Sequence, residues 1–235
     1  MQTVSLSFFR FSPGLARIWA FAMMGLARPA MRKVPGIGFW KLCGSGTGEG
    51  FTPIPNTGVY AILATWPDYE TARIATETAK IFKRYKARAT EAYTVFLNPV
   101  SVRGEWSGVR PFERSDDPGH GPVAALTRAT VKPKRALLFW SRVPDISDMI
   151  GEDPNVAFKI GIGEVPLLHQ VTFSIWPDTQ GMARFARADG PHARAIKAVR
   201  EGDWFHEELY ARFNVRGDRG TWEGKRPLDR LGVNQ

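Results

Sequence analysis

Two stretches of this chain resemble each other, and this internal similarity constrains the fold more than any other feature of the sequence. Leu6–Pro13 (LSFFRFSP) aligns with Leu126–Pro133 (LTRATVKP) at a spacing of 120 residues. Ala64–Asp68 (ATWPD) aligns with Ser174–Asp178 (SIWPD) at a spacing of 110 residues. Between the second and the third predicted strand of each copy, the spacing of matching residues falls from 118 to 110. The loop between these two strands is therefore eight residues shorter in the second copy. We therefore expect two copies of one structural unit.

Each copy is predicted to have the same order of elements: strand, helix, strand, strand, helix, strand. Short alternating runs predict strands, and longer apolar runs with helical spacing predict helices. This is the order of ferredoxin-like folds and places the chain in the α+β class. The predicted division is a first ferredoxin-like repeat over residues 1–102, a linker rich in Gly and Pro over 103–122, a second repeat over 123–216 and an irregular tail over 217–235.

Composition indicates a folded protein with a basic surface. The chain has 235 residues, a net charge of +9 and one cysteine, Cys43, which excludes an internal disulfide and a cysteine-based zinc site. The basic residues are dispersed and form no recognised nucleic-acid motif, so we expect no nucleic acid partner. They favour an anionic membrane surface or an acidic electron donor as the partner.

No secretory signal is visible, and the apolar run Ile18–Ala27 is too short to span a bilayer.

The first predicted helix, Leu15–Lys33, is apolar on more than one side and ends in basic residues. The simpler interpretation is a helix that covers a sheet; the alternative is a helix that faces lipid, with its cations near anionic headgroups. Further helices are predicted at Tyr69–Thr90 and Pro133–Ile150. The glycine-rich run Gly44–Gly50 lacks the GK[ST] of a P-loop, so it is interpreted as a hairpin loop or as a lid over a pocket.

Of the four histidines, His192 is the best candidate for holding a cofactor. It follows Pro191 at a predicted helix start and shares a helical face with Ile196 and Val199. The positive helix N-terminus disfavours a protonated ring, and a neutral imidazole is what a metal ligand must be. On the residues alone, a packed core or capping histidine is the simpler interpretation and a ligand is the alternative. His206 and His169 are weaker candidates.

Several long motifs resemble the spheroidene monooxygenase family of purple photosynthetic bacteria. They are PNTGVYAILATWPD, GEDPNVAFKIGIGEVPLLHQVTFSIWPD, GPHARAI and WFHEELYARF. The resemblance implies a fold like the dimeric α+β barrel superfamily, and haem b as cofactor with O2 as co-substrate and reduced ferredoxin as electron donor. It implies His192 as the ligand of the haem iron, with His206 and His169 as fallbacks. Distal-side candidates on strand-like runs of the second copy are Thr172, Ser174 and Arg212.

The resemblance also implies the reaction and the surroundings of the enzyme. C2 of spheroidene, and of hydroxyspheroidene, would be hydroxylated twice, and the geminal diol would lose water to give the 2-keto carotenoid spheroidenone. A carotenoid dissolves in the bilayer, so we expect a cytoplasmic protein in peripheral contact with the intracytoplasmic membrane, with a homo-oligomer possible. The alternatives are a cofactor-free monooxygenase of the same superfamily and a non-catalytic carotenoid-binding protein.

Overall fold

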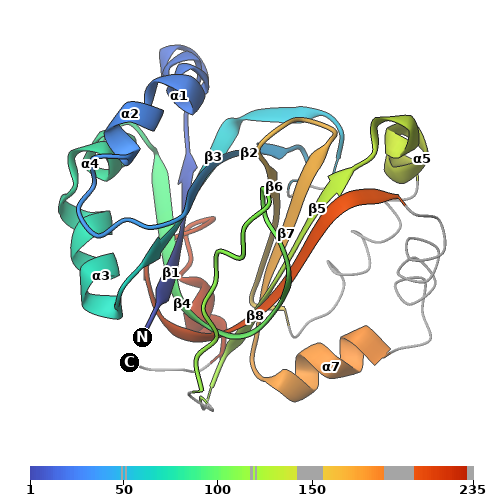
Figure 1. The fold of residues 1–235 in the computed structure, drawn as a ribbon. Coiled ribbons are helices and arrows are strands. Elements are labelled where there is room, and N and C mark those ends of the chain that lie inside the picture. Colours follow the sequence, from blue (N-terminus) through green and yellow to red (C-terminus); the bar gives the residue numbers. More distant parts are fainter. Residues whose placement is uncertain are drawn as a thin grey trace.

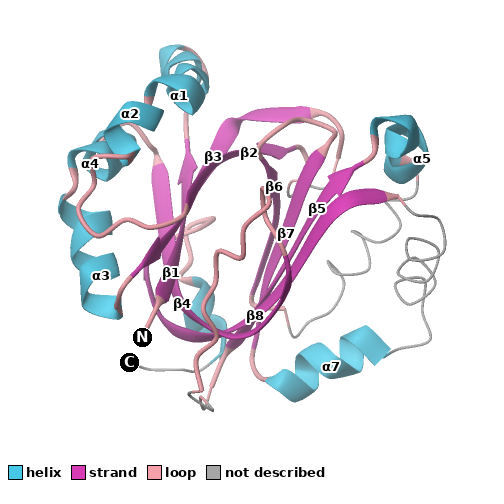
Figure 2. Ribbon diagram, in the orientation of Figure 1, coloured by secondary structure: helices cyan, strands magenta, loops and turns pink. Residues whose placement is uncertain are grey.

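The computed structural model describes residues 1–48, 50, 52–116, 119, 121–141, 156–187 and 204–231, the side chains of 184–187 excepted. Figures 1 and 2 show the elements in order along the chain. The strands are β1 (Thr3–Arg10), β2 (Trp40–Gly46), β3 (Pro55–Trp66), β4 (Glu91–Gly104), β5 (Val123–Val131), β6 (Phe158–Gly163), β7 (His169–Trp176) and β8 (Phe205–Gly220). The helices are α1 (Leu15–Leu26), α2 (Arg28–Met31), α3 (Tyr69–Thr78), α4 (Lys80–Lys86), η1 (Pro133–Arg135), α5 (Ala136–Trp140), α7 (Thr179–Arg187) and η2 (Pro227–Leu231).

The strands form one closed antiparallel barrel in the order β1-β3-β2-β6-β7-β5-β8-β4. We call β1–β4 with their helices the first half, and β5–β8 with theirs the second half. β1 lies between β3 and β4, and β5 lies between β7 and β8. The halves meet where β2 pairs with β6 and where β4 pairs with β8. Every strand therefore has a neighbour on both sides, although β2 and β6 share only the pairs Gly44–Gly163 and Ser45–Ile162.

Alternation along the strands sends one set of side chains into the barrel and the other set outward. The barrel interior is filled by a continuous aromatic and aliphatic core that both halves supply, with members such as Phe8, Tyr93, Phe158, Phe173 and Phe213. On the outside, α1–α4 cover the first half, as Figure 1 shows at the left. A second buried cluster lies between those helices and the sheet. The molecule is therefore of the α+β class that the sequence predicted.

The predicted helices are interrupted for local reasons. The segment predicted as Leu15–Lys33 divides into α1 and α2 next to Pro29, which has no N–H to continue the ladder. The segment predicted as Tyr69–Thr90 divides into α3 and α4 at Ala79, whose backbone is extended. Within the described part of the chain, every helix falls short of the length and apolar character that crossing a bilayer would need.

Each half ends in a similar loop, which the sequence analysis did not recognise. β4 is followed by GEWSGVRPF from Gly104, and β8 is followed by GTWEGKRPL from Gly220, at a spacing of 116 residues. Both glycines have a left-handed φ, 93° and 88°, that favours glycine. Trp106 pairs with Val109 in the first loop, and Trp222 pairs with Lys225 in the second. The predicted linker therefore begins inside β4, and the predicted irregular tail contains the end of β8 and η2.

A glutamate from the other half holds each of these tryptophan loops. The Glu207 carboxylate accepts the N–H groups of Ser107 and Gly108 at 2.9 and 2.7 Å. The Glu91 carboxylate accepts the N–H of Gly224 at 2.8 Å. Glu91 and Glu207 are themselves 116 residues apart, so the two ends of the barrel are closed by equivalent contacts.

Candidate functional site

The predicted distal residues Thr172, Ser174 and Arg212 lie on one face of three adjacent strands. Ala125 of β5 pairs with Ser174 of β7 on one side and with Arg212 of β8 on the other. Directly paired residues point to the same side of a sheet, and so do residues two apart on a strand. The side chains of Thr172, Ser174 and Arg212 therefore project from the outside of the barrel in the second half. The structure brings together residues from two strand-like runs, Thr172 and Ser174 from one and Arg212 from the other.

We call this surface the second outer face. It is defined by paired residues of β5, β7 and β8, namely Ala125, Thr127, Thr172, Ser174, Tyr210 and Arg212. Most of its side chains are small, and Thr127, Tyr210 and Arg212 are exposed. At one end it is bounded by an apolar cluster in which Met182 of α7 packs against Trp176 and Val123.

Two hydroxyl groups on the second outer face, those of Ser174 and Thr172, can form hydrogen bonds with a bound molecule. The Ser174 hydroxyl accepts the indole N–H of Trp176 at 2.9 Å, which leaves its own proton for a further acceptor. Thr172 is half-buried two residues earlier on the same strand. Arg212 adds a guanidinium that remains charged and suits a carboxylate. A flat, largely apolar group with acidic substituents fits such a surface, because small side chains let it approach and the cation lies at the rim.

Of the predicted iron ligands, His192 lies outside the described residues, beyond the end of α7 at Arg187. His169 has its Nδ1 3.6 Å from Glu164, and its strand neighbours Val171 and Phe173 belong to the barrel core. Burial lowers the pKa of His169, although the nearby Glu164 carboxylate opposes this. His206 is exposed. His169 is on the inward side of β7, whereas His206 is on the outward side of β8, four residues before Tyr210, at a bulge in the pairing with β5. The described residues include no cluster of three or more His, Cys, Asp or Glu side chains suited to a metal ion.

A buried ionic cluster inside one end of the barrel was not predicted from the sequence. The Arg128 guanidinium is 1 % exposed and forms ion pairs with Glu207 and Glu164. Lys41 lies 2.7 Å from Glu164, which also accepts the indole N–H of Trp106 at 2.7 Å. The alternation of inward and outward side chains along β5 could have revealed Arg128, because it occupies the inward position that follows Leu126. The cluster closes the barrel beneath the Trp106 loop, and we interpret it as structural.

The thiol of Cys43 lies in the barrel core beside this cluster and is fully buried. Burial is the main cause that raises its pKa far above the ordinary value, with a smaller contribution from Glu164. A thiol that stays protonated is a poor nucleophile. We therefore interpret Cys43 as a packing residue.

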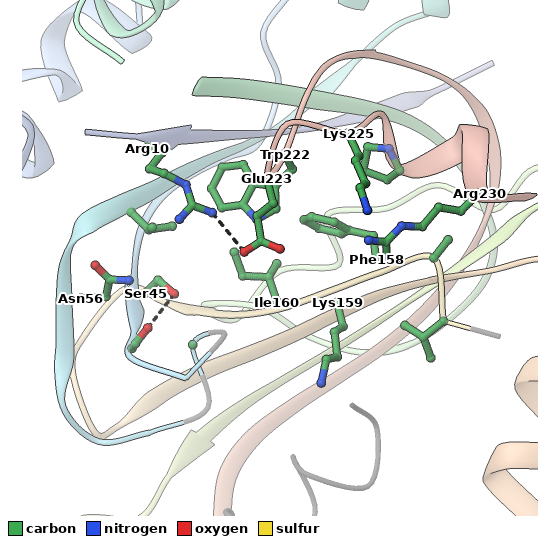
Figure 3. Close-up of a pocket in the computed structure, with 16 residues that line it drawn as sticks. Arg10, Ser45, Asn56, Phe158, Lys159, Ile160, Trp222, Glu223, Lys225 and Arg230 are labelled. Atoms are coloured by element: carbon green, nitrogen blue, oxygen red, sulfur yellow. Dashed lines mark hydrogen bonds and ion pairs between the residues drawn. The ribbon is translucent and has the colours of Figure 1, made fainter. Parts of the chain in front are cut away.

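A pocket of about 220 Å³ opens at the other end of the barrel, beneath the Trp222 loop. Figure 3 shows Lys225 and Arg230 near the ring of Phe158, and Arg10 beside Trp222 and Glu223. Its lining includes the glycine-rich loop between β2 and β3, as the predicted lid would require. The volume is below the roughly 300–1,000 Å³ of typical cofactor pockets, and none of the predicted site residues that the structure describes lines it. We therefore place the candidate site on the second outer face.

This chain is similar to known proteins over most of its length. Proteins named spheroidene monooxygenase from Cereibacter sphaeroides and Rhodobacter capsulatus are 54% and 52% identical; each alignment covers 97% of this chain, and 71% and 96% of the respective relative. One from Rubrivivax gelatinosus is 33% identical over 90% of this chain and 81% of the relative. No protein-family model matches the chain. A crystal structure of aldoxime dehydratase is similar in fold alone, with a TM-score of 0.62 at 11% identity, over 91% of this chain and 82% of that one.

Proposed function

Because the chain belongs to the spheroidene monooxygenase family, we propose that it oxidises C2 of spheroidene, and of hydroxyspheroidene, to the 2-keto carotenoid. Two successive hydroxylations convert the CH2 group first to an alcohol and then to a geminal diol, which loses one water to give the ketone. Each hydroxylation consumes one O2, two electrons and two protons, and releases one water. Reduced ferredoxin is the proposed source of the electrons.

The proposed cofactor is haem b, seated against the second outer face. Bound haem would supply O2 activation, which side chains cannot provide for an unactivated C–H bond. The described residues fit such a group in two respects: the face is built largely from small side chains, and Arg212 offers a cation for an acidic substituent. His192 would hold the haem iron, because it follows α7 in the chain and α7 packs at the border of this face through Met182. This combination of small residues and a cation is the observation on which the proposed site depends.

The roles of the side chains follow from their positions on this face. The Thr172 and Ser174 hydroxyls would hold protons beside the O2 side of the site, and Ser174 is oriented by the Trp176 indole. Arg212 would fix the orientation of the cofactor through an acidic group. The apolar border made by Val123, Trp176 and Met182 would exclude water and meet the hydrocarbon substrate.

We further propose that the fold is a tandem pair of ferredoxin-like repeats in a dimeric α+β barrel-like architecture. Leu6 pairs with Leu63, and Leu126 pairs with Phe173, so the paired residues have the same spacings of 120 and 110 residues as the internal similarity. Asp68 and Asp178 of the shared WPD motifs both cap helices, accepting N–H groups at 2.7 and 2.6 Å. The two tryptophan loops add a third shared feature.

The surroundings of the enzyme are proposed from the substrate and the charge. A carotenoid is soluble only in lipid, so we propose that the protein works from the cytoplasm in peripheral contact with the membrane. The net charge of +9 suits an acidic ferredoxin, whose approach would then weaken with salt. A homo-oligomer is compatible with these proposals.

The proposed reaction is tested by turnover of purified protein with spheroidene, O2 and reduced ferredoxin, followed by mass spectrometry of the pigment. We expect an alcohol that rises and then falls as the ketone accumulates, with oxygen derived from O2 and no product under argon. Full turnover by a colourless protein would favour the cofactor-free alternative. Tight pigment binding without turnover would favour a carotenoid-binding protein and contradict the proposal.

A further inference from the structure

The outward side of α1 is apolar along its whole length, which is unusual for a surface helix. Leu15, Ile18, Phe21 and Leu26 are 84%, 66%, 68% and 72% exposed. The other exposed residues of the helix are Ala22 and Gly25. Its inward side buries Ala20 and Met23 against the first half of the barrel, so packing on the barrel is already satisfied. An exposed apolar patch of this kind marks an interaction surface.

The charge around α1 has a single sign. The first acidic residue of the chain is Glu49, whereas the preceding 48 residues contain six Lys or Arg side chains. Arg28, Arg32 and Lys33 are exposed directly beyond the C-terminal end of α1. Arg88, from the loop after α4, lies 4.6 Å above the ring of Trp19, on the flank of the same helix. The apolar side of α1 is therefore bordered by cations.

We propose that the outward side of α1 is the surface by which this protein docks on an anionic lipid bilayer. The choice of lipid rests on the proposed function, because the carotenoid substrate dissolves in the bilayer. Leu15, Ile18 and Phe21 enter the boundary between headgroups and acyl chains, as in helices that lie in the membrane plane. Arg28, Arg32 and Lys33 remain at the level of anionic headgroups.

The same charges disfavour a second copy of this chain as the occupant. A symmetric contact across α1 would bring each exposed cation near the same cations of its partner, with no acidic residue in this segment to offset them. An anionic lipid surface offers the opposite charge. The six residues that define the second outer face all lie on strands of the other half, so changes on α1 leave the proposed site intact.

The test is co-sedimentation of the full chain with vesicles of phosphatidylcholine alone and of phosphatidylcholine mixed with phosphatidylglycerol. We expect binding to the mixed vesicles, weakened about tenfold or more by Ile18→Ser with Phe21→Ser, since two apolar anchors are lost. Arg28→Gln with Arg32→Gln and Lys33→Gln should remove the preference for phosphatidylglycerol. Ile74→Ser, at a 47% exposed position on α3, is the matched control and should bind as the unchanged protein does.

Equal binding by the unchanged protein and the Ile18→Ser, Phe21→Ser variant would overturn the proposal. So would a dimer in size-exclusion chromatography that dissociates in this variant and does not bind vesicles, because α1 would then be a contact between copies. Circular dichroism confirms that each variant is folded. Oxidation of detergent-dispersed spheroidene is measured in parallel: the variant should retain it, and its absence in the unchanged protein would count against the proposed function without bearing on docking.

Discussion

The outer faces of the two halves have the same strand register but different side chains. Four large apolar residues of the first half, each buried beneath its helices, lie at the register positions that small or charged residues occupy in the second half. Phe9, Leu42, Ile62 and Phe96 correspond to Ala129, Gly161, Thr172 and Arg212. The pairs Leu42–Ile62 and Gly161–Thr172 set the spacing of β2 and β6 at 119 residues, so the predicted spacing of 118 was wrong by one residue. The residues that point into the barrel remain mostly apolar in both halves.

This difference separates stability from function within one architecture. The first outer face is a sheet–helix core, in which rings such as those of Phe96 and Tyr69 pack 5.4 Å apart. The second outer face leaves exposed and half-buried polar groups at positions that would otherwise be core. Among the described residues, little apolar packing covers this face, and we propose that the haem lies there.

The largest expected contrast in stability is between Phe96→Ala and Arg212→Ala. Removing the buried ring of Phe96 should cost about 3–5 kcal/mol in the free energy of unfolding, because it leaves a cavity beneath α3. Removing the exposed Arg212 side chain should change it by less than about 0.5 kcal/mol. Urea unfolding measures both. An equal loss of unfolding free energy in the two variants would show that the second outer face is a packed core, and would contradict the difference between the two faces.

Filling the second outer face should abolish most of the activity while the protein remains folded. Ala125→Phe places a ring between Ser174 and Arg212, where the cofactor is proposed to lie. Turnover of spheroidene should fall on the order of 10²-fold, the cost of misplacing reacting groups by about an ångström. Ala125→Ser is the matched control, because serine occupies the equivalent position in the first half as Ser5, and its turnover should stay near that of the unchanged protein.

The two tryptophan loops allow a comparison of the barrel ends. Glu207→Gln should cost about 1–3 kcal/mol, more than Glu91→Gln, because Glu207 pairs with the buried Arg128 whereas Glu91 pairs with the more exposed Arg10. Urea unfolding at neutral pH gives both values. A cost for Glu91→Gln equal to or above that for Glu207→Gln would contradict the account of the ionic cluster.

The same glutamates make a prediction about acid. Burial raises the pKa of Glu207 and of Glu91, but loop N–H groups and the neighbouring arginines outweigh it, so both pKa values are below the ordinary 4.5. Groups with a lowered folded pKa stabilise the protein above the unfolded pKa, and this stability is lost as pH falls through the folded value. Unfolding free energy should therefore fall below about pH 4.5, and less steeply in Glu207→Gln.

The smallest expected effect is at the surface of the first half. Arg73 and Glu70 form an exposed ion pair on α3 at 2.6 Å. Arg73→Ala should leave the free energy of unfolding, measured in urea, almost unchanged, because exposed pairs are screened by water. A cost similar to that of Phe96→Ala would mean that the stability of the first half does not come from its buried apolar layer.

The sequence predicted the strands well because their alternation is set by one buried side. The structure contains the eight strands that two copies of the predicted order require, and the longest of them, β8, runs from Phe205 to Gly220. The helices were less predictable: Ala79 interrupts α3 and α4 without a proline or glycine to indicate the break.

The candidate site could be predicted only in part. Thr172, Ser174 and Arg212 were chosen separately, and their common face depends on the register of β5 with β7 and β8, which is a long-range property. The two tryptophan loops were missed because glycine and proline near Trp106 and Trp222 suggested irregular chain. The ionic pairing of Arg128 depends on Glu164 and Glu207, which are distant in sequence.

Haem at the second outer face, held by His192, is the central proposal, and the absorption spectrum of the purified, haem-loaded protein tests it directly. We expect a Soret band that is lost in His192→Ala, weakened in Ala125→Phe and retained in His206→Ala. An unchanged band in both His192→Ala and Ala125→Phe would contradict the account, because it would place the haem elsewhere.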